Sequence, residues 1–419
     1  MILFSLVLIA LALVGAPLFA IIGASAMWGF MQADIPQVVM GIELYRIAEM
    51  PILLAIPLFT FAGYVLSESQ APSRLVRLSN ALLGWMPGGL AVVCLATCAL
   101  FSAFTGASGV TIIALGALLY PALLEGGYRE GFSLGVVTSS GSLGLLFAPS
   151  LPLILYGVVS QASIDDLFRA GVTPGVLMVV MLSVWCIWSS RKNRKAVKQF
   201  SWGEVRQALR EAGWEIPLPI VVLGGIYSGY FAVSEAAAVT ALYVLVLYLL
   251  IRREIKLVEM PRIMRESMVL VGGILMILGV SIASTSLMID QEVPQRLLAA
   301  ITGFVSGQVS FLLLMLLFLL ILGAILDIFS ALVLIVPLLL PVAVNYGIHP
   351  LHFGIIFLAT MELGYLTPPV GLNLFISSYR FEKPITSVYL ATIPFFLILL
   401  LSVLVITFVP QLSLWLVPD

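Results

Sequence analysis

Charged side chains are scarce in this chain of 419 residues, where Asp, Glu, Lys and Arg together fill only 10% of the positions. Soluble domains carry about 25% charged residues. Hydrophobic residues fill 61% of the chain, and the mean hydropathy is +1.16. A spanning helix needs about 20 apolar residues, so the length allows on the order of a dozen membrane segments. The composition therefore predicts an all-α polytopic membrane protein that is surrounded by lipid.

Features typical of several other protein classes are also missing. The net charge of -1 leaves no basic surface, so we expect no nucleic-acid partner. No G-x-x-x-x-G-K-[ST] loop occurs, which excludes ATP binding by that route. Cys94 and Cys98 lie one helical turn apart in an apolar run, which favours small buried thiols over a disulfide or a metal pair. His349 and His352 are predicted to lie in an external loop without a nearby carboxylate, which argues against a metal site.

No catalytic dyad or triad is visible at membrane depth. An intramembrane enzyme, the alternative from a different class, would need such a group or a set of metal ligands in its spanning segments. We therefore expect neither enzymatic activity nor a cofactor.

The apolar segments predict the membrane topology. Residues 2–31 lack the basic n-region of a signal peptide and are too long for a signal core, so we expect them to be retained as the first spanning helix. Two regions, 88–124 and 309–345, are long, apolar and interrupted midway by small or polar residues, which predicts two re-entrant hairpins. The other segments long enough to span are 50–66, 130–159, 170–190, 216–232, 234–251, 266–289, 352–379 and 385–410.

The distribution of Lys and Arg predicts the orientation. With a cytoplasmic N-terminus, and with each hairpin leaving on the side where it entered, all but three of the 20 Lys and Arg lie in cytoplasmic loops. The exceptions are Arg46, Arg169 and Arg296. The hairpins then enter from opposite sides as an inverted pair, and the C-terminus is periplasmic. The stretches RKNRKAVK and SWGEVRQALREAGW form a cytoplasmic linker over about 191–213, either as an interfacial segment or as a solvated tether.

The sequence that follows each hairpin is repeated. FSLGVVTSSGSLGLLFAPSLPLILYG aligns with FGIIFLATMELGYLTPPVGLNLFISS, so that Pro149 matches Pro368 at an offset of 219 and Gly144 matches Gly364 at 220. Proline within a span lacks an amide donor and clashes with the preceding turn, which interrupts the helix. Packed membrane helices also tolerate simple kinks of this kind. Two matched breaks, each beside a polar-tipped hairpin, favour inverted repeats with broken helices, the architecture of secondary transporters.

These motifs resemble those of the large membrane subunit of tripartite ATP-independent periplasmic (TRAP) transporters over essentially the whole chain. The most specific motifs are FSAFTGASGVTIIALG (101–116), GSLGLLFAPSLPLILYG (141–157), GGIYSGYFAVSEAAAV (224–239) and MELGYLTPPVGLNLF (361–375). At the first break, Ala148 stands where the family usually has the first of two prolines. Before Glu235, the chain has Ala-Val-Ser where the family usually has Thr-Pro-Thr.

The resemblance implies an elevator-type ion-transporter fold and coupling to sodium without ATP hydrolysis. It implies import of an organic acid, such as a C4-dicarboxylate or a sialic acid, across the bacterial inner membrane. The implied partners are a periplasmic substrate-binding protein that delivers the solute and a small four-helix membrane subunit on a separate chain. A transporter of another family with the same fold would need no binding protein.

The resemblance also implies how the chain is divided. N-terminal scaffold helices are expected at 1–83 and further scaffold helices at 170–304. The transport domain is expected to consist of a first repeat at 84–169 and a second repeat at 305–384. A C-terminal helix follows at 385–419.

Hydroxyls, carboxylates and the free carbonyls of a broken helix are suitable ligands for sodium. We expect sodium and substrate to bind at Ser102, Thr105, Gly106, Ser108, Gly144, Pro149, Asp327, Ser330, Thr360, Gly364, Thr367, Pro368 and Asn373. Asp327 is a lone acid at the second hairpin tip, and its repeat partner at an offset of 219 is Ser108. Because a carboxylate inside the membrane is costly unless it is paired or functional, Asp327 is either a sodium ligand or a protonated or capping aspartate at the hairpin turn. Glu362 and Glu235 are expected to have structural roles.

Overall fold

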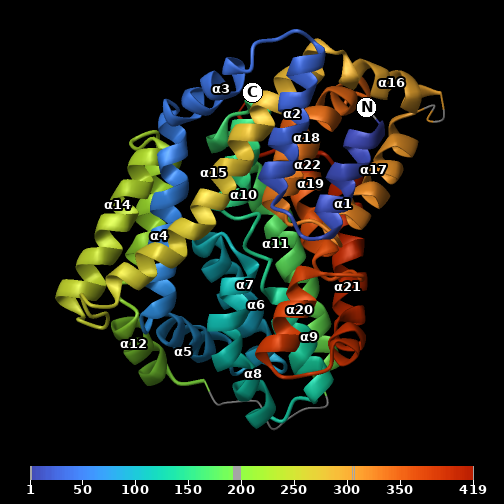
Figure 1. The fold of residues 1–419 in the computed structure, drawn as a ribbon. Helices are drawn as coiled ribbons and strands as arrows, with labels where there is room; N and C mark the ends of the chain where they lie inside the picture. The colour runs from blue at the N-terminus through green and yellow to red at the C-terminus, as the bar shows by residue number, and fades with distance from the viewer. Residues whose placement is uncertain (1, 192–199, 304, 306, 419) are drawn as a thin grey trace.

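The structure, a computed structural model, describes residues 2–191, 200–303, 305 and 307–418. Every regular element among these residues is helical (Figure 1), which confirms the predicted all-α fold. By length and composition, six helical segments can cross a membrane, or seven when the bent pair α7 (Ser108–Ala114) and α8 (Gly116–Glu125) counts as one. The six segments are Pro51–Glu68, Ile164–Ser189, Val233–Ile251, Met260–Asp290, Ile328–Asn345 and Ile385–Phe408.

A first group of helices surrounds α4, which packs against α14 and α15, while α15 also packs against α2 and α3. The group consists of α2 (Leu18–Gln32), α3 (Val38–Ala48), η1 (Pro51–Leu54), α4 (Ala55–Glu68), α5 (Ala71–Leu83), α12 (Trp202–Glu211), α13 (Pro217–Tyr227), α14 (Val233–Leu245), η3 (Val246–Ile251), α15 (Met260–Asp290) and α16 (Val293–Thr302). Glu235 has the predicted structural role, because its carboxylate accepts the Ala232 amide at 3.0 Å at the start of α14.

The N-terminal apolar run folds as a short helical hairpin. α1 (Ile2–Leu13) ends just before Gly15, whose φ of 90° allows the chain to reverse into α2. Phe4 stacks on Trp28 with the ring centroids 4.6 Å apart, so the two helices run antiparallel. The prediction of one spanning helix over 2–31 is therefore wrong. The N-terminus lies at the end of the molecule that holds α3 and α16 (Figure 1), so its predicted cytoplasmic side no longer follows from a single span and stays a prediction.

The two hairpins and the two broken helices form a second group. The first hairpin consists of α6 (Gly89–Thr105), α7 and α8, and the second consists of α17 (Gln308–Gly323) and α18 (Ile328–Asn345). The broken helices are α9 (Glu130–Ser140) with α10 (Leu151–Ser160), and α19 (Pro350–Gly364) with α20 (Leu372–Arg380). The helices α11 (Ile164–Ser189), α21 (Ile385–Phe408) and α22 (Gln411–Leu414) pack against this group. The hairpins approach each other from opposite ends of the molecule, as predicted (Figure 1).

Each hairpin packs against both repeats. Its first arm, α6 or α17, lies against the first half of the broken helix in its own repeat, α9 or α19. Its second arm crosses to the other repeat, so that α7 packs against α20 and α18 packs against α10. The same exchange occurs in both halves, which is the relation expected of two repeats.

The amphipathic part of the predicted linker is a packed helix. α12 lies on α5, and an ion pair between Arg77 and Glu211, 2.6 Å apart, joins the two helices. A solvated tether is therefore not what this segment forms. The basic stretch before α12 begins at Arg191, and its remaining residues fall within 192–199, which lie outside the described residues.

Candidate functional site

The first hairpin tip is built against the first break. α6 ends at Thr105, and Gly106 turns the chain with a φ of 65° while its amide donates to the Ser102 carbonyl at 2.9 Å. The Ser102 hydroxyl accepts the Gly144 amide at 2.9 Å. A Cβ on Gly144 would lie 2.2 Å from the Ala99 carbonyl oxygen, so only glycine permits this approach. The predicted residues Ser102 and Gly144 therefore meet.

Further hydroxyls surround this tip. Thr105 Oγ1 lies 3.3 Å from Thr111 Oγ1, which sits one turn after Ser108 at the start of α7. Pro149 lies in the break, and the hydroxyl of the next residue, Ser150, is buried without a hydrogen-bond partner in the described part of the chain. Thr111 and Ser150 were missed from sequence, although each lies within one turn of a predicted residue.

The second hairpin tip is built on Asp327. Its Oδ2 accepts the amides of Phe329 and Ser330, both at 3.0 Å, and its Oδ1 accepts the Ser330 hydroxyl at 2.5 Å. The carboxylate thus caps α18, which is one of the two roles predicted for it. The Ile328 amide donates to the Tyr365 hydroxyl at 2.7 Å and so ties the tip to the second break. Tyr365 was missed from sequence, although it lies inside the most specific motif.

The structure also changes the register between the two tips. α7 begins at Ser108 and α18 begins at Ile328, so the tips are related by an offset of 220. Ala107 therefore occupies, in the first repeat, the position that Asp327 holds in the second. The predicted pairing of Asp327 with Ser108 is wrong by one residue, and the first tip has no acid at this position.

The second break packs closely on α17. A Cβ on Gly364 would lie 2.6 Å from the Gly323 Cα, so two glycines allow the helices to touch. The amides of Val370 and Gly371 donate to the Ala324 carbonyl at 3.2 and 3.1 Å. Backbone amides thus hold the second break to its hairpin tip. At the first break, the Gly144 amide has the same role.

Three predicted residues of the second broken helix do not take part in this contact. The Thr360 hydroxyl donates to the Ile356 carbonyl at 2.7 Å, and the Thr367 hydroxyl donates to the Leu363 carbonyl at 3.1 Å. Pro368 is exposed. Both threonine hydroxyl groups therefore donate to the carbonyl four residues earlier and not to the hairpin tip.

Asn373 joins the two repeats. Its Nδ2 donates to the Thr138 carbonyl at 3.4 Å and to the Ser142 hydroxyl at 3.3 Å, so α20 meets the end of α9 and the first break. Its Oδ1 is buried and has no hydrogen-bond partner among the described residues. The oxygens of Asn373 and Ser150 are therefore two unpaired acceptors at the first break.

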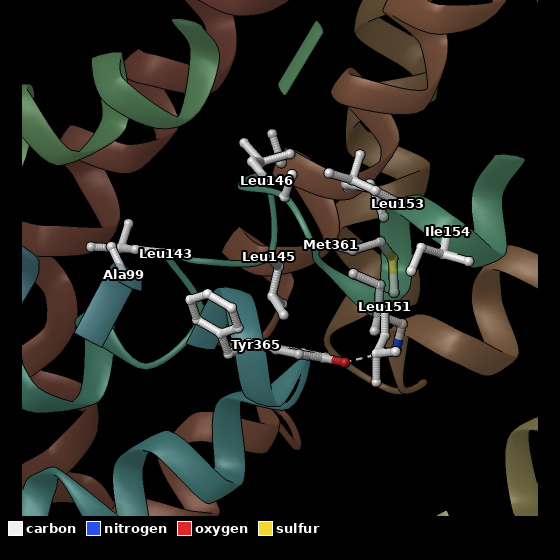
Figure 2. Close-up of a cluster of buried hydrophobic side chains, with 14 of the residues drawn as sticks. Ala99, Leu143, Leu145, Leu146, Leu151, Leu153, Ile154, Met361 and Tyr365 are labelled. Atoms are coloured by element: carbon white, nitrogen blue, oxygen red, sulfur yellow. Dashed lines mark hydrogen bonds between the residues drawn. The ribbon is translucent and has the colours of Figure 1, made fainter. Parts of the chain in front are cut away.

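Apolar side chains enclose the space between the breaks. Figure 2 shows Leu145, inside the first break, and Leu151, at the start of α10, in one cluster with Met361 and Tyr365 of the second repeat. Glu362 follows Met361 and is only 1% exposed, and neither of its carboxyl oxygens has a hydrogen-bond partner in the part of the chain that the structure describes. The structural role expected of Glu362 is therefore not a hydrogen bond or an ion pair of its carboxyl group with another described residue.

A cavity of about 340 Å³ lies between the two groups of helices, at the end that holds α3. Polar side chains line it from several elements, namely Arg46 of α3, Thr285 and Ser286 of α15, and Gln161 after α10. Arg46 lies 3.2 Å from Glu43, and its side chain remains 52% exposed. The cavity thus offers a cation and several hydroxyl and amide groups to a polar solute.

The two histidines are structural. His349 caps α19 by accepting the Leu351 amide at 3.2 Å. His352 is buried inside α19, within 3.1 Å of the Ser413 hydroxyl, so its predicted place in an external loop is wrong. Among the described residues, no group of three His, Cys, Asp or Glu is arranged to hold a metal ion.

The comparisons with known proteins agree with this architecture. The family model described as "Tripartite ATP-independent periplasmic transporter, DctM component" matches residues 2–412. The C4-dicarboxylate TRAP transporter large permease protein DctM of Pseudomonas aeruginosa is 33% identical, over 90% of this chain and 88% of its own length. The ectoine/5-hydroxyectoine TRAP transporter large permease protein UehC of Ruegeria pomeroyi is 31% identical, over 98% and 97%. The sialic acid TRAP transporter large permease protein SiaM of Vibrio cholerae is 31% identical, over 86% and 85%.

A solved structure shows the same fold. The YdaH transporter of Alcanivorax borkumensis superposes on 91% of this chain and 89% of its own, with a TM-score of 0.64 and 15% sequence identity. At that identity the likeness concerns the fold alone. The family match and the relatives above go further, and the chain belongs to the DctM component family of tripartite ATP-independent periplasmic transporters.

Proposed function

We propose that this chain is the large membrane subunit of a sodium-coupled importer for an organic acid in the bacterial inner membrane. The family assignment supports a role in transport. The observation that supports a cation site is that two oxygens at the first break, Asn373 Oδ1 and Ser150 Oγ, are buried and have no hydrogen-bond partner among the described residues. Oxygen atoms at a broken helix are the usual setting for a coupling sodium ion in secondary transporters.

A second sodium site is proposed at Asp327 with the backbone carbonyls from Gly364 to Pro368. Among the described residues, Asp327 Oδ1 accepts a hydrogen bond only from the Ser330 hydroxyl, which leaves acceptor capacity for a cation. Capping α18 and binding sodium are compatible roles, because a carboxylate has about four lone-pair sites.

The proposed mechanism is an elevator movement of the hairpins and broken helices against the helices around α4. The crossed packing of α7 on α20 and of α18 on α10 supports a single moving body, because it joins the two repeats. The cavity beside Arg46 lies between part of this body and the helices α3 and α15. The division into scaffold and transport segments at 84–169 and 305–384 is part of this proposal.

The proposed partners are a small four-helix membrane subunit and a periplasmic binding protein. The relatives' names give C4-dicarboxylate, ectoine and sialic acid as the solutes of those proteins. Arg46 is suited to meet the carboxylate of a delivered acid, because arginine binds carboxylates through charge-assisted hydrogen bonds.

Uptake in proteoliposomes tests the proposal. The large subunit is reconstituted with its small subunit, the loaded binding protein is added outside, and the solute is chosen by a binding screen on that protein. We expect uptake to require an inward sodium gradient and to be absent with the large subunit alone. Full-rate uptake driven by protons or ATP without sodium contradicts the sodium coupling, and robust uptake by the chain alone contradicts the need for partners.

A further inference from the structure

A second cavity, of about 680 Å³, opens between the start of α9 and the end of α11. It lies at the end of the molecule that carries α5, α8 and α12 with the basic loops (Figure 1). Arg129, just before α9, and Phe132 of α9 line one side, and Trp188 of α11 lines the other together with Ser190 and Arg191, which directly follow α11. The lining holds two guanidinium groups and no carboxylate.

Both arginines are available to an anion. Arg129 and Arg191 are exposed, and neither forms an ion pair with any described residue. Glu130, the acid next to Arg129, is paired with Lys383. Arg129 is also the N-cap residue of α9, which has no side-chain cap, so the positive end of the helix dipole adds to the two charges.

An apolar stripe runs from this cavity along α11. Val176, Val180, Val184 and Trp188 follow one another at intervals of four residues, and each is between 46% and 61% exposed. Residues four apart share one face of a helix. Twelve residues of helix rise about 18 Å, close to the roughly 15 Å of hydrocarbon in one leaflet. The stripe fits an acyl chain. A free inorganic anion has no apolar part that could contact the stripe.

We propose that this cavity binds the phosphate headgroup of an anionic phospholipid in the cytoplasmic leaflet, with one acyl chain lying along the stripe. Arg129 and Arg191 hold the phosphate, and the Ser190 side chain lies beside it. Trp188 stands between the cavity and the stripe, at the level where Trp is favoured in membrane proteins. The leaflet follows from the basic loops at this end of the molecule.

The test compares the purified full chain with Arg129→Gln/Arg191→Gln. The matched control is Arg206→Gln/Arg210→Gln, which removes two exposed arginines from α12 at the same end. Native mass spectrometry counts the lipids retained, and thermal unfolding in detergent measures stabilisation by dioleoyl phosphatidylglycerol. Phosphatidylcholine and inorganic phosphate serve as separate probes.

We expect the cavity variant to bind phosphatidylglycerol about 25-fold more weakly, which is roughly fivefold per arginine, and the control to bind as the parent does. Phosphatidylcholine and inorganic phosphate at the same concentration should not stabilise the parent. The lipid-free Tm should be the same in all three proteins, because the four arginines are exposed. A second variant, Val180→Gln/Val184→Gln, should weaken dioleoyl but not dihexanoyl phosphatidylglycerol.

Three outcomes overturn the proposal. Equal phosphatidylglycerol binding by the cavity variant and the parent removes the site. If the α12 control loses as much phosphatidylglycerol binding as the cavity variant, the lipid is attracted by general positive charge and not by this cavity. Stabilisation of the parent by inorganic phosphate as strong as that by the lipid makes this a site for a free anion.

Discussion

The carboxyl group of Glu362 is buried without a hydrogen-bond donor or a counter-charge among the described residues. An unpaired charge at membrane depth costs about 3 kcal/mol or more, so the neutral acid is the form that fits. We expect Glu362→Gln, which keeps the shape without a charge, to hold its Tm within about 2 °C and to retain uptake. Glu362→Lys should not fold. A Gln variant that is stable but inactive would show that this carboxyl group takes part in transport.

Asp327 combines a structural and a proposed ionic role that substitutions can separate. Asn caps helices nearly as well as Asp, so Asp327→Asn should leave the Tm almost unchanged. Loss of the charge should raise the sodium concentration for half-maximal uptake several-fold. Ser330→Ala removes the hydroxyl bonded to Oδ1 and tests separately whether this hydroxyl, which is also among the expected ligands, contributes to sodium binding. An Asn variant with the parent's sodium dependence would leave Asp327 with the capping role alone.

At the scale of helices, the contact between each break and its hairpin depends on glycine. An added Cβ would lie 2.2 Å from a backbone oxygen at Gly144 and 2.6 Å from a backbone carbon at Gly364. Backbone cannot yield as a side-chain tip does, so Gly144→Ala and Gly364→Ala should each destabilise the protein by about 1–3 kcal/mol and reduce uptake. At Gly272 on α15, an added Cβ would meet no atom within 4 Å outside its own helix. Gly272→Ala should therefore be neutral or slightly stabilising. Detergent unfolding midpoints that do not differ among the three variants would contradict this account.

The helices that could be predicted well from the sequence are those whose ends are marked by residues close to them in the chain. Pro and Gly mark the two breaks, and the matched motifs identify them as repeats, so the hairpins and broken helices were predictable. Hydropathy over 2–31 cannot distinguish one long span from two short helices, and the reversal at Gly15 was overlooked for that reason. Contacts such as Asn373 with Ser142 join residues more than two hundred positions apart, and no local pattern encodes them. The register between the tips was off by one because the alignment rested on the breaks.

At the scale of the whole molecule, Arg74 holds separate segments together at the basic end. It is buried, with Nη2 2.6 Å from Glu215 Oε1 and Nη1 2.5 Å from Glu254 Oε1. Removing one partner of a buried ion pair costs roughly 3–5 kcal/mol, so Arg74→Gln should lower the Tm by about 3–6 °C. Arg77→Gln breaks the more exposed pair with Glu211 and should change the Tm little. Equal effects of the two substitutions would contradict the importance of burial.

Acid should weaken the same network. Burial by itself raises the pKa of Glu254, but hydrogen bonds from Arg74 and from the Gln70 amide, with the charge of Arg74, outweigh burial and lower it. A carboxyl group whose pKa is lowered by folding contributes stability above its unfolded pKa, and this contribution is lost as the pH falls through the folded pKa. The Tm difference between the parent and Arg74→Gln should therefore shrink as the pH falls from about 6 to below about 4. A difference that is constant over this range would show that Glu254 contributes nothing.

α7 packs against a helix that the ribosome makes much later. Gly109 of α7 lies against Ile376 of α20, and the Arg380 guanidinium donates to the Ile113 carbonyl at 3.2 Å, across 267 positions of sequence. At about 5–20 residues per second, the partner of α7 emerges roughly 15–50 s after α7 itself. During that time the first hairpin is in the membrane with one packing face unfilled. A nascent chain that stops before α20 therefore leaves its first re-entrant hairpin unfinished, and the order of synthesis sets when the first repeat acquires its native packing.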